Sequence, residues 1–178
     1  MKILLLVGSG DVGSHSLGLA EAIEAQLVKD GAETEIINLA DYKLPLYYRL
    51  TERQDAYDDK TREFLDKSYA ADGFVWVTPI YHNSFSGLLK NALDWQHTKF
   101  PHKAVGFASN GGNRSPQAVD QLMLIARAQH LHSVRVRVCT QESDFNDAKQ
   151  VSAPEIHNRI SDFCQELIDL SKRVTKTS

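Results

Sequence analysis

The sequence has no large excess of charge of either sign, few cysteines and no long apolar run. Its net charge is −3 over 178 residues, which argues against a nucleic-acid or anionic-membrane surface. The apolar run at residues 3–7 is too short to cross a bilayer, and no small-residue cleavage site follows it. Cys139 and Cys164 form no Cys-x-x-Cys pair and are expected to be buried thiols. These features favour a cytoplasmic protein.

The histidines show no metal-binding spacing. His130 and His132 lie two residues apart, without a nearby carboxylate in a recognised ligand pattern, so no metal is expected. Cys139 is not followed by the arginine-closed loop of a cysteine phosphatase, so no nucleophilic role is expected for it.

Apolar runs alternate with helical patterns along the whole chain, which predicts an α/β fold with a parallel sheet covered by helices. No linker or repeat interrupts the alternation, so residues 1–178 are expected to form a single domain. The predicted strands are Lys2–Val7, Glu35–Leu39, Gly73–Thr78, Ala104–Ser109 and Val134–Thr140. The predicted helices are Ser14–Lys29, Asp58–Tyr69, Ser84–Thr98, Pro116–Gln129 and Pro154–Val174.

The character of each strand predicts its place in the sheet. Residues 3–7 and 74–77 are apolar on both faces, as central parallel strands are. Residues 134–138 alternate valine with arginine, and residues 33–35 are polar, so both of these strands suit an edge. The five-stranded order 2-1-3-4-5 follows, which is that of flavodoxin-like three-layer folds. A ligand is then expected at the turns after strands one, three and four.

The stretch from Pro79 to Trp95 joins a buried strand to a helix with one apolar stripe. It contains the pattern Pro-x-Tyr-x-x-Ser-x-x-Gly-x-Leu-Lys-Asn-Ala-x-Asp-Trp. This pattern resembles the second signature of the NADPH-dependent FMN reductase family, which includes azo- and quinone-reducing members. The matching residues are Pro79, Tyr81, Ser84, Gly87, Leu89, Lys90, Asn91, Ala92, Asp94 and Trp95. Where the family commonly has Glu, Asn and Gly, this chain has Ile80, His82 and Asn83.

The turn at residues 8–16 has three glycines and three serines between a strand and a helix. Such a turn binds phosphate well, and the alternative is a tight turn with a serine N-cap. It resembles the Gly-Ser-x-Arg-x-x-Ser segment that holds the FMN phosphate in the family, and Ser9, Ser14 and Ser16 carry over. Asp11 stands where the family has arginine. A carboxylate there opposes a phosphate unless it is paired or turned outward.

Two further segments complete the expected site. Residues Ser109–Gly112 resemble the family's third flavin loop, with Ser109, Asn110, Gly111 and Gly112 beside the ring. A glycine-rich turn before a helix is the alternative. The neighbouring Arg114 is a candidate for the phosphate of a nicotinamide cofactor or an exposed arginine without that role. The loop Asp41–Tyr57 is either a functional segment, as a folded lid or part of a contact with another subunit, or a hydrophobic patch packed on its own domain. The resemblance implies the subunit contact.

The resemblance implies an oxidoreductase that uses FMN as cofactor and NADPH or NADH as co-substrate to reduce a small acceptor such as flavin, quinone or azo compound. Pro79, Tyr81, His82, Asn83 and Ser84 are expected to contact the flavin ring. A homodimer or homotetramer through the Ser84–Thr98 helix is also implied, with Trp95 as a possible anchor at its margin. The alternative function is an FMN-binding electron carrier or redox sensor without efficient turnover. A receiver-type signalling domain is disfavoured, because acids do not cluster after the first strand.

Overall fold

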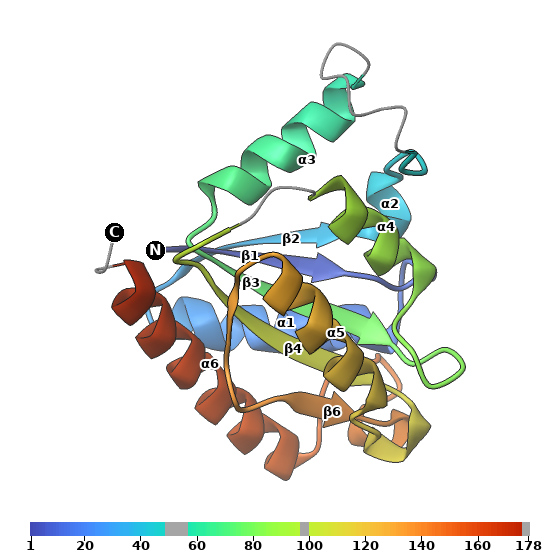
Figure 1. Ribbon diagram of the computed structural model, residues 1–178. Helices are drawn as coiled ribbons and strands as arrows, with labels where there is room; N and C mark the ends of the chain where they lie inside the picture. The colour runs from blue at the N-terminus through green and yellow to red at the C-terminus, as the bar shows by residue number, and fades with distance from the viewer. Residues whose placement is uncertain (49–56, 97–99, 176–178) are drawn as a thin grey trace.

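The computed structural model describes residues 1–48, 57–96 and 100–175, and shows a parallel sheet between two layers of helices (Figure 1). The strands are β1 Lys2–Val7, β2 Glu33–Asn38, β3 Gly73–Pro79, β4 Ala104–Asn110, β5 His132–Ser133 and β6 Val138–Thr140. The helices are α1 His15–Lys29, α2 Leu39–Tyr42, α3 Asp59–Ala70, α4 Gly87–Trp95, α5 Gln117–Ala128 and α6 Pro154–Thr175. Two short 3-10 helices, η3 Gly112–Arg114 and η4 Glu142–Asp144, were not predicted, nor was α2.

The strand order β2-β1-β3-β4-β5 confirms the predicted order, and all pairs are parallel. Every residue of β3 is buried, and β1 is buried from Ile3 onward, as expected for central strands covered on both faces. The partly exposed β2 lies at one edge. Because parallel strands run the same way, the turns after β1, β3 and β4 all leave the sheet at one end.

The fifth predicted strand is interrupted, which corrects the single strand expected at Val134–Thr140. On the outer side of β4, two short strands, β5 and β6, take the place of the single predicted strand, and residues 134–137 separate them. The backbone N–H groups of Arg135 and Val136 donate instead to the Glu166 carboxylate on α6, at 3.1 and 2.8 Å. A carboxylate from a distant helix has therefore replaced the strand's hydrogen bonds at the point where the alternating pattern looked most regular.

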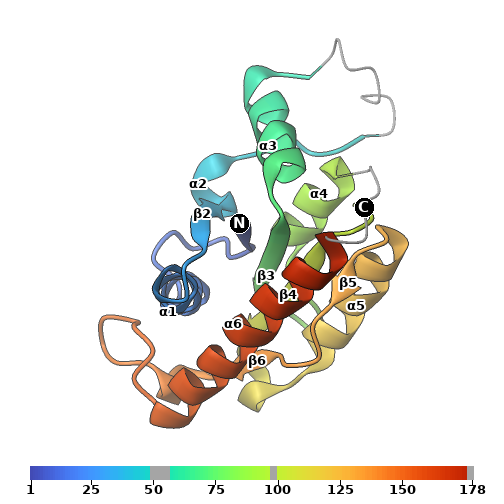
Figure 2. The ribbon, with the colours of Figure 1, turned by 90° about the vertical axis from the view of Figure 1, so that its left-hand side faces the viewer.

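Two separate hydrophobic layers cover the sheet. Helices α1 and α6 pack against one face, and α3, α4 and α5 against the other. Seen from the side in Figure 2, α1 lies on one side of the sheet and α4 and α5 on the other. Close packing is visible at Gly106 of β4, where a Cβ would overlap the Phe163 ring of α6. No helix in the described ranges is long and apolar enough to span a membrane.

Helix α4 is shorter than predicted, from Gly87 to Trp95, and residues 97–99 lie outside the described part of the chain. Its stripe is confirmed at Leu89, Ala92 and Leu93, which are buried. Trp95 was expected at an exposed margin, but it is only 2% exposed. Its ring packs edge-on against the rings of Tyr47 and Tyr57, with ring centroids 5.2 and 5.3 Å apart. Trp95 is therefore core to its own chain, which corrects its assignment as an interface anchor.

The cysteine prediction holds for one thiol and fails in part for the other. Cys164 is fully buried beneath α1, and burial raises the pKa of its thiol to about 12. Cys139, on the edge strand β6, is only partly buried. Neither forms a disulfide.

Candidate functional site

The turns after β1, β3 and β4 are held together by hydrogen bonds at the carboxyl ends of the strands. The Gly8 N–H donates to the Val77 carbonyl at 2.8 Å, and the Ile80 N–H donates to the Asn110 carbonyl at 2.9 Å. A third link comes from Ser86, whose hydroxyl donates to the Gly8 carbonyl. The three turns therefore form one continuous surface at this end of the sheet.

Ser86 is a residue that the sequence analysis missed. Its hydroxyl also accepts from the Leu89 N–H at 3.1 Å, which makes it the N-cap of α4. Its own N–H donates to the Thr78 hydroxyl at 3.0 Å. A serine immediately before an apolar stripe is a recognisable N-cap signal. The signal was present, but the bond to Gly8 depends on tertiary packing.

The first turn leads directly into α1 through an N-cap. The Ser14 hydroxyl accepts from the Leu17 N–H at 3.2 Å, and Ser14 has extended backbone angles. The N–H groups of Ser14, His15 and Ser16 have no hydrogen-bond partner within the described residues, as is usual for a first helical turn. Ser9 and Ser16 are buried, with the Ser9 hydroxyl accepting from the Asp11 N–H at 3.2 Å. The predicted serine N-cap is therefore present, and it leaves the N–H groups at the helix start without partners in the described residues.

The Asp11 carboxylate is engaged on two sides. Its Oδ1 accepts from the Gly13 N–H at 3.2 Å, and its Oδ2 lies 3.5 Å from Lys149 Nζ. Lys149 also donates to the Gly13 carbonyl. No local pattern links residue 149 with residue 11, so sequence reasoning could not have found this lysine. The condition stated above, that the carboxylate be paired, is met.

The second turn is a tight hairpin of four residues, Tyr81 to Ser84. The N–H groups of Tyr81 and Ser84 each donate to the other's carbonyl at 2.9 Å. His82 and Asn83 both have positive φ, 50° and 63°, which is the geometry of a type I′ turn. The family's Asn-Gly is the preferred pair for that turn, so the family signature has a conformational reason here. The pair His82-Asn83 adopts the same shape with less favourable residues.

The outward groups of this hairpin are exposed and its base is fixed. Tyr81 is 50% exposed, and His82 and Asn83 are exposed too. On the other side, Ser84 donates to Gln121 of α5 at 2.7 Å, and Gln121 donates back to the Asn83 carbonyl at 2.9 Å. Pro79, the last residue of β3, is buried. The structure therefore presents Tyr81, His82 and Asn83 to solvent and uses Pro79 and Ser84 as supports.

The third turn brings glycine backbone beside the second. Gly111 has φ of 120°, and its N–H donates to the Thr140 carbonyl at 2.8 Å. A Cβ at Gly111 would lie 3.6 Å from the Ile80 side chain, an ordinary contact. Gly112 has φ of 55° and begins η3. The positive φ, more than crowding, is what requires glycine here.

Ser109 and Asn110 differ in how open they are. The Ser109 hydroxyl is fully buried and has no hydrogen-bond partner in the described residues. Asn110 is partly exposed, and its side-chain oxygen accepts from the Thr140 hydroxyl at 3.1 Å. Of the two, Asn110 is the side chain that faces the surface of the turn.

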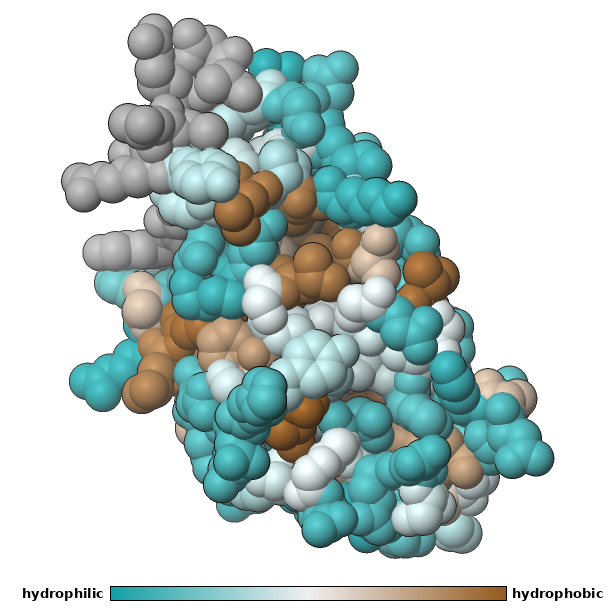
Figure 3. Space-filling view, turned by 90° about the vertical axis from the view of Figure 1, so that its right-hand side faces the viewer, coloured by the Kyte–Doolittle hydropathy of each residue, from teal (hydrophilic) through white to brown (hydrophobic). Residues whose placement is uncertain are grey.

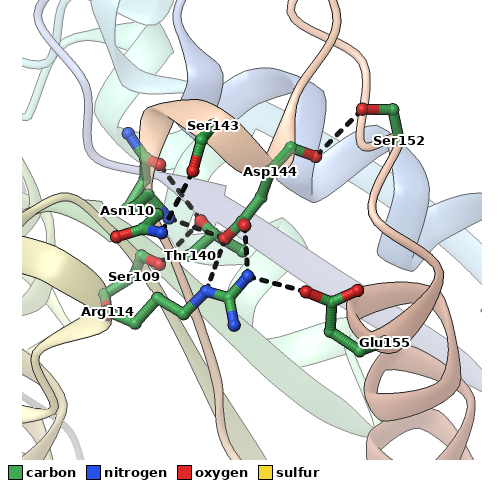
Figure 4. Close-up of polar contacts among 9 residues, drawn as sticks. Ser109, Asn110, Arg114, Thr140, Ser143, Asp144, Ser152 and Glu155 are labelled. Carbon is green, nitrogen blue, oxygen red and sulfur yellow. Dashed lines mark hydrogen bonds and ion pairs between the residues drawn. The ribbon is translucent and has the colours of Figure 1, made fainter.

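Arg114 is bound by two carboxylates, as Figure 4 shows. Its Nε lies 2.9 Å from Asp144 Oδ2. Its Nη2 contacts Asp144 Oδ1 and lies 2.9 Å from Glu155 Oε1. Burial alone raises the pKa of Asp144, but Arg114 and the Gln141 N–H outweigh it and hold that pKa below its ordinary value. The charge of Arg114 is therefore already paired with two carboxylates. This argues against Arg114 as the residue that binds a nicotinamide phosphate.

The loop after α2 packs on α4, which decides in part between the two readings of Asp41–Tyr57. The Asn91 side chain accepts from the Tyr47 N–H at 2.8 Å and donates to the Pro45 carbonyl at 3.0 Å. Trp95 Nε1 donates to the same carbonyl at 2.8 Å. Residues 43–48 are thus docked on their own chain by two residues of the signature, and residues 49–56 lie outside the described part.

The surface formed by the turns after β1, β3 and β4 is called here the strand-end face. It carries exposed apolar side chains among polar ones (Figure 3). Val12, Tyr81 and Leu88, which belong to the turns or to α4, are 52%, 50% and 38% exposed. A separate open pocket of about 570 Å³ lies beyond β6 and is lined by Arg114, Cys139 and Arg159 among others. Two of its arginines are ion-paired, Arg114 as above and Arg137 with Asp120. The strand-end face is therefore the candidate functional site.

Comparison with known proteins identifies the family. The family model described as NADPH-dependent FMN reductase matches residues 1–143, and these residues include all three turns. The chain belongs to the NADPH-dependent FMN reductase family. The FMN-dependent NADPH-azoreductase of Staphylococcus aureus (strain USA300) is 34% identical over 149 residues, covering 82% of this chain and 79% of that protein.

Solved structures agree with this family in fold. A structure of an NADH:FMN oxidoreductase, in its apo form, is 28% identical, with a TM-score of 0.70 over 93% of this chain and 89% of that one. The NAD(P)H:(acceptor) oxidoreductase FerB of Paracoccus denitrificans has a TM-score of 0.80 at 16% identity, over 97% of each chain. That second likeness shows a shared fold. The protein is an oxidoreductase, with FMN as the family's cofactor and NADPH as its co-substrate.

Proposed function

We propose that this protein reduces small aromatic acceptors, azo compounds and quinones among them, with NADPH and a single FMN held on the domain formed by residues 1–178. Membership of the family and the relatives named as azoreductases support this activity. FMN supplies, when bound, a ring that takes a hydride from NADPH and releases electrons to the acceptor.

The observation that carries the proposal is the donor set at the start of α1. The three N–H groups of residues 14–16, with the hydroxyl of Ser14, match the acceptor oxygens of a phosphate at a helix N-terminus. The turn is open beside Gly13, where a Cβ would meet no atom within 4 Å. We assign Ser9, Ser14 and Ser16 to the phosphate end, with Ser9 shaping the turn.

The flavin ring is proposed to lie across the second and third turns. The hairpin Tyr81–Ser84 would border one side of the ring and Asn110–Gly112 the other, with Pro79 and the buried Ser109 fixing the strand ends beneath. Glycine at 111 and 112 lets backbone approach a flat ligand. The exposed Tyr81 and His82 would then contact both the ring and the acceptor.

An anaerobic spectral titration tests this proposal. The purified protein is titrated with FMN, and NADPH is then added in the absence of oxygen. We expect a perturbed flavin spectrum on binding and bleaching of the visible bands by NADPH. Turnover is then compared with an azo dye, a quinone and free FMN at equal concentration. Binding without bleaching by NADPH or NADH would instead identify an electron carrier or sensor, and would refute the proposed reductase.

A homodimer or homotetramer that uses α4 remains part of the proposal, but its contact must be revised. Trp95 is buried, so the exposed residues of this helix, such as Leu88, are what a second subunit would meet. Sedimentation equilibrium of the wild type and Leu88→Asp checks this. A monomeric wild type would refute the assembly.

A further inference from the structure

A segment at the end of the family match packs beside the proposed phosphate site. Residues 141–153, called here the arm, extend past residue 143, where the match to the family model ends. The Phe145 ring lies edge-on against His15, the first residue of α1, with ring centroids 4.9 Å apart. Further along the arm, the Lys149 carbonyl lies so close to Gly18 that any Cβ there would collide with it. The arm is therefore packed against the first turns of α1.

The arm is closed by its own hydrogen bonds, which fix the position of Lys149. The Asn146 N–H donates to the Gln150 carbonyl at 2.9 Å, and the Lys149 N–H donates to the Asn146 carbonyl at 2.8 Å. Lys149 itself has φ of 59°. At its base, the Asp144 carboxylate accepts from Arg114, and the Asp144 carbonyl accepts from the Ser152 hydroxyl at 3.4 Å (Figure 4). The same carbonyl accepts from the Ser152 N–H at 2.8 Å. The closed loop therefore fixes where the Lys149 backbone lies relative to α1.

The Lys149 side chain reaches the outer side of the turn after β1. Lys149 Nζ contacts the Gly13 carbonyl and lies 3.5 Å from the Asp11 carboxylate. Residues 8–16 contain no lysine or arginine of their own. Asp11 and the Gly13 carbonyl belong to the same turn as the N–H groups of residues 14–16, and both are contacted by Lys149. Because the Gly13 carbonyl and the Ser14 N–H belong to one peptide plane, holding the carbonyl also fixes the direction of that N–H.

We propose that Lys149 is a positioning residue of the phosphate site. It holds the Asp11 carboxylate and the Gly13 carbonyl on the outer side of the turn, so that the N–H groups of α1 meet the phosphate without an opposing free charge. Lys149 thus offsets the loss of the arginine that Asp11 replaces. This inference rests on the proposed placement of the FMN phosphate and assigns a part of that site to a residue outside the family match.

The test measures flavin binding to the apoprotein, without turnover. Flavin fluorescence quenching gives the dissociation constants of FMN and of riboflavin, which lacks the phosphate. We expect Lys149→Gln to weaken FMN binding about three- to fivefold, a modest change because the ion pair is exposed. Riboflavin binding should not change. The matched control is Lys90→Gln, which removes an exposed lysine paired with Asp94 on α4. It should leave both constants unchanged.

A double-mutant cycle separates positioning from direct contact. If Lys149 acts through Asp11, then Lys149→Gln should have less than about a twofold effect in an Asp11→Asn background. An equal loss in both backgrounds would mean that Lys149 does not act through the Asp11 carboxylate, and would overturn the role of holding that carboxylate away from the phosphate. Unchanged FMN binding in the single variant, or an equal loss for riboflavin, would also overturn it.

A second variant moves the arm without changing any charge. Gly18→Ala forces the Lys149 carbonyl away from α1 and should weaken FMN binding in the same direction. Thermal unfolding of each variant verifies that it is folded. Whether wild-type apoprotein binds FMN tests the proposed function, and the difference between wild type and variants tests this inference.

Discussion

The turn after β3 and the turn after β1 are built in opposite ways. The hairpin at residues 81–84 closes on itself through two backbone hydrogen bonds between Tyr81 and Ser84. The turn at residues 8–14 has side-chain bonds of its own at Ser9 and Asp11, but it is also held by distant parts of the chain, the Ser86 hydroxyl and the Lys149 ammonium group. The backbone of the hairpin therefore closes locally, while the turn after β1 depends in addition on side chains from elsewhere in the domain.

The largest effect is expected from Asp144, which anchors the arm that supports the first turn. Asp144→Asn removes the charge of a carboxylate that is 1% exposed and bound to Arg114 and the Gln141 N–H. We expect a loss of about 2 kcal/mol in the free energy of unfolding, because hydrogen bonds to a charged group are lost. Urea denaturation at neutral pH measures it. Asp120→Asn, at the exposed pair with Arg137, is the matched control and should change stability little.

The same substitution has a predicted pH dependence. The pKa of Asp144 is lowered from its ordinary value of 3.8, so its contribution is fully present above that value and is lost as the pH falls through the lowered folded-state pKa. The stability difference between wild type and Asp144→Asn should therefore be constant near neutral pH and shrink in acid below about pH 4. A difference that grew in acid would contradict this account.

A smaller loss is expected from Ser86, which joins the two turns. Ser86→Ala removes the N-cap of α4 and leaves the Gly8 carbonyl without its hydroxyl donor. The expected cost is about 1.5 kcal/mol in the free energy of unfolding. Ser86→Thr keeps the hydroxyl and should recover part of the loss. If both variants unfold like the wild type, Ser86 does not support the first turn.

A substitution at Asn91 measures how far the loop at residues 43–48 depends on its contacts with α4. Asn91→Ala removes both bonds to the loop, those to Pro45 and Tyr47. We expect a loss of about 1 kcal/mol and faster proteolytic cleavage within residues 43–48. Lys90→Ala, one position earlier on the same helix, is the control. Equal cleavage rates for the Asn91 variant and the wild type would refute the docking role.

The smallest effect is a gain, and it tests the locally determined turn. His82→Asn with Asn83→Gly introduces the residue pair that a type I′ turn prefers, because both positions have positive φ. We expect about 0.5 kcal/mol of added stability, since relief of backbone strain exceeds the added entropy of glycine in the unfolded chain. Thermal unfolding measures the shift. A lower melting temperature would mean that the His82 and Asn83 side chains contribute contacts of their own.

Particular elements show how far sequence reasoning reached. The central strands β1 and β3 were predicted within a residue of their bounds, because burial on both faces leaves a continuous apolar run. The last predicted strand failed because Glu166 takes the N–H groups of residues 135 and 136. The signature residue Trp95 was assigned the wrong environment, since helical periodicity gives a residue's angle around the helix and not what covers it.

The sequence alone determined the alternation of strands and helices, the strand order, the family signature and the three turns where a flavin is expected. Each of these follows from patterns within a few residues: apolar runs, caps, and glycines beside strand ends. Only the tertiary structure decided how the first turn tolerates Asp11, because Lys149 is brought to it from the far end of the chain. Charge pairing acts through space, and no local periodicity records which distant residue will provide the opposite charge.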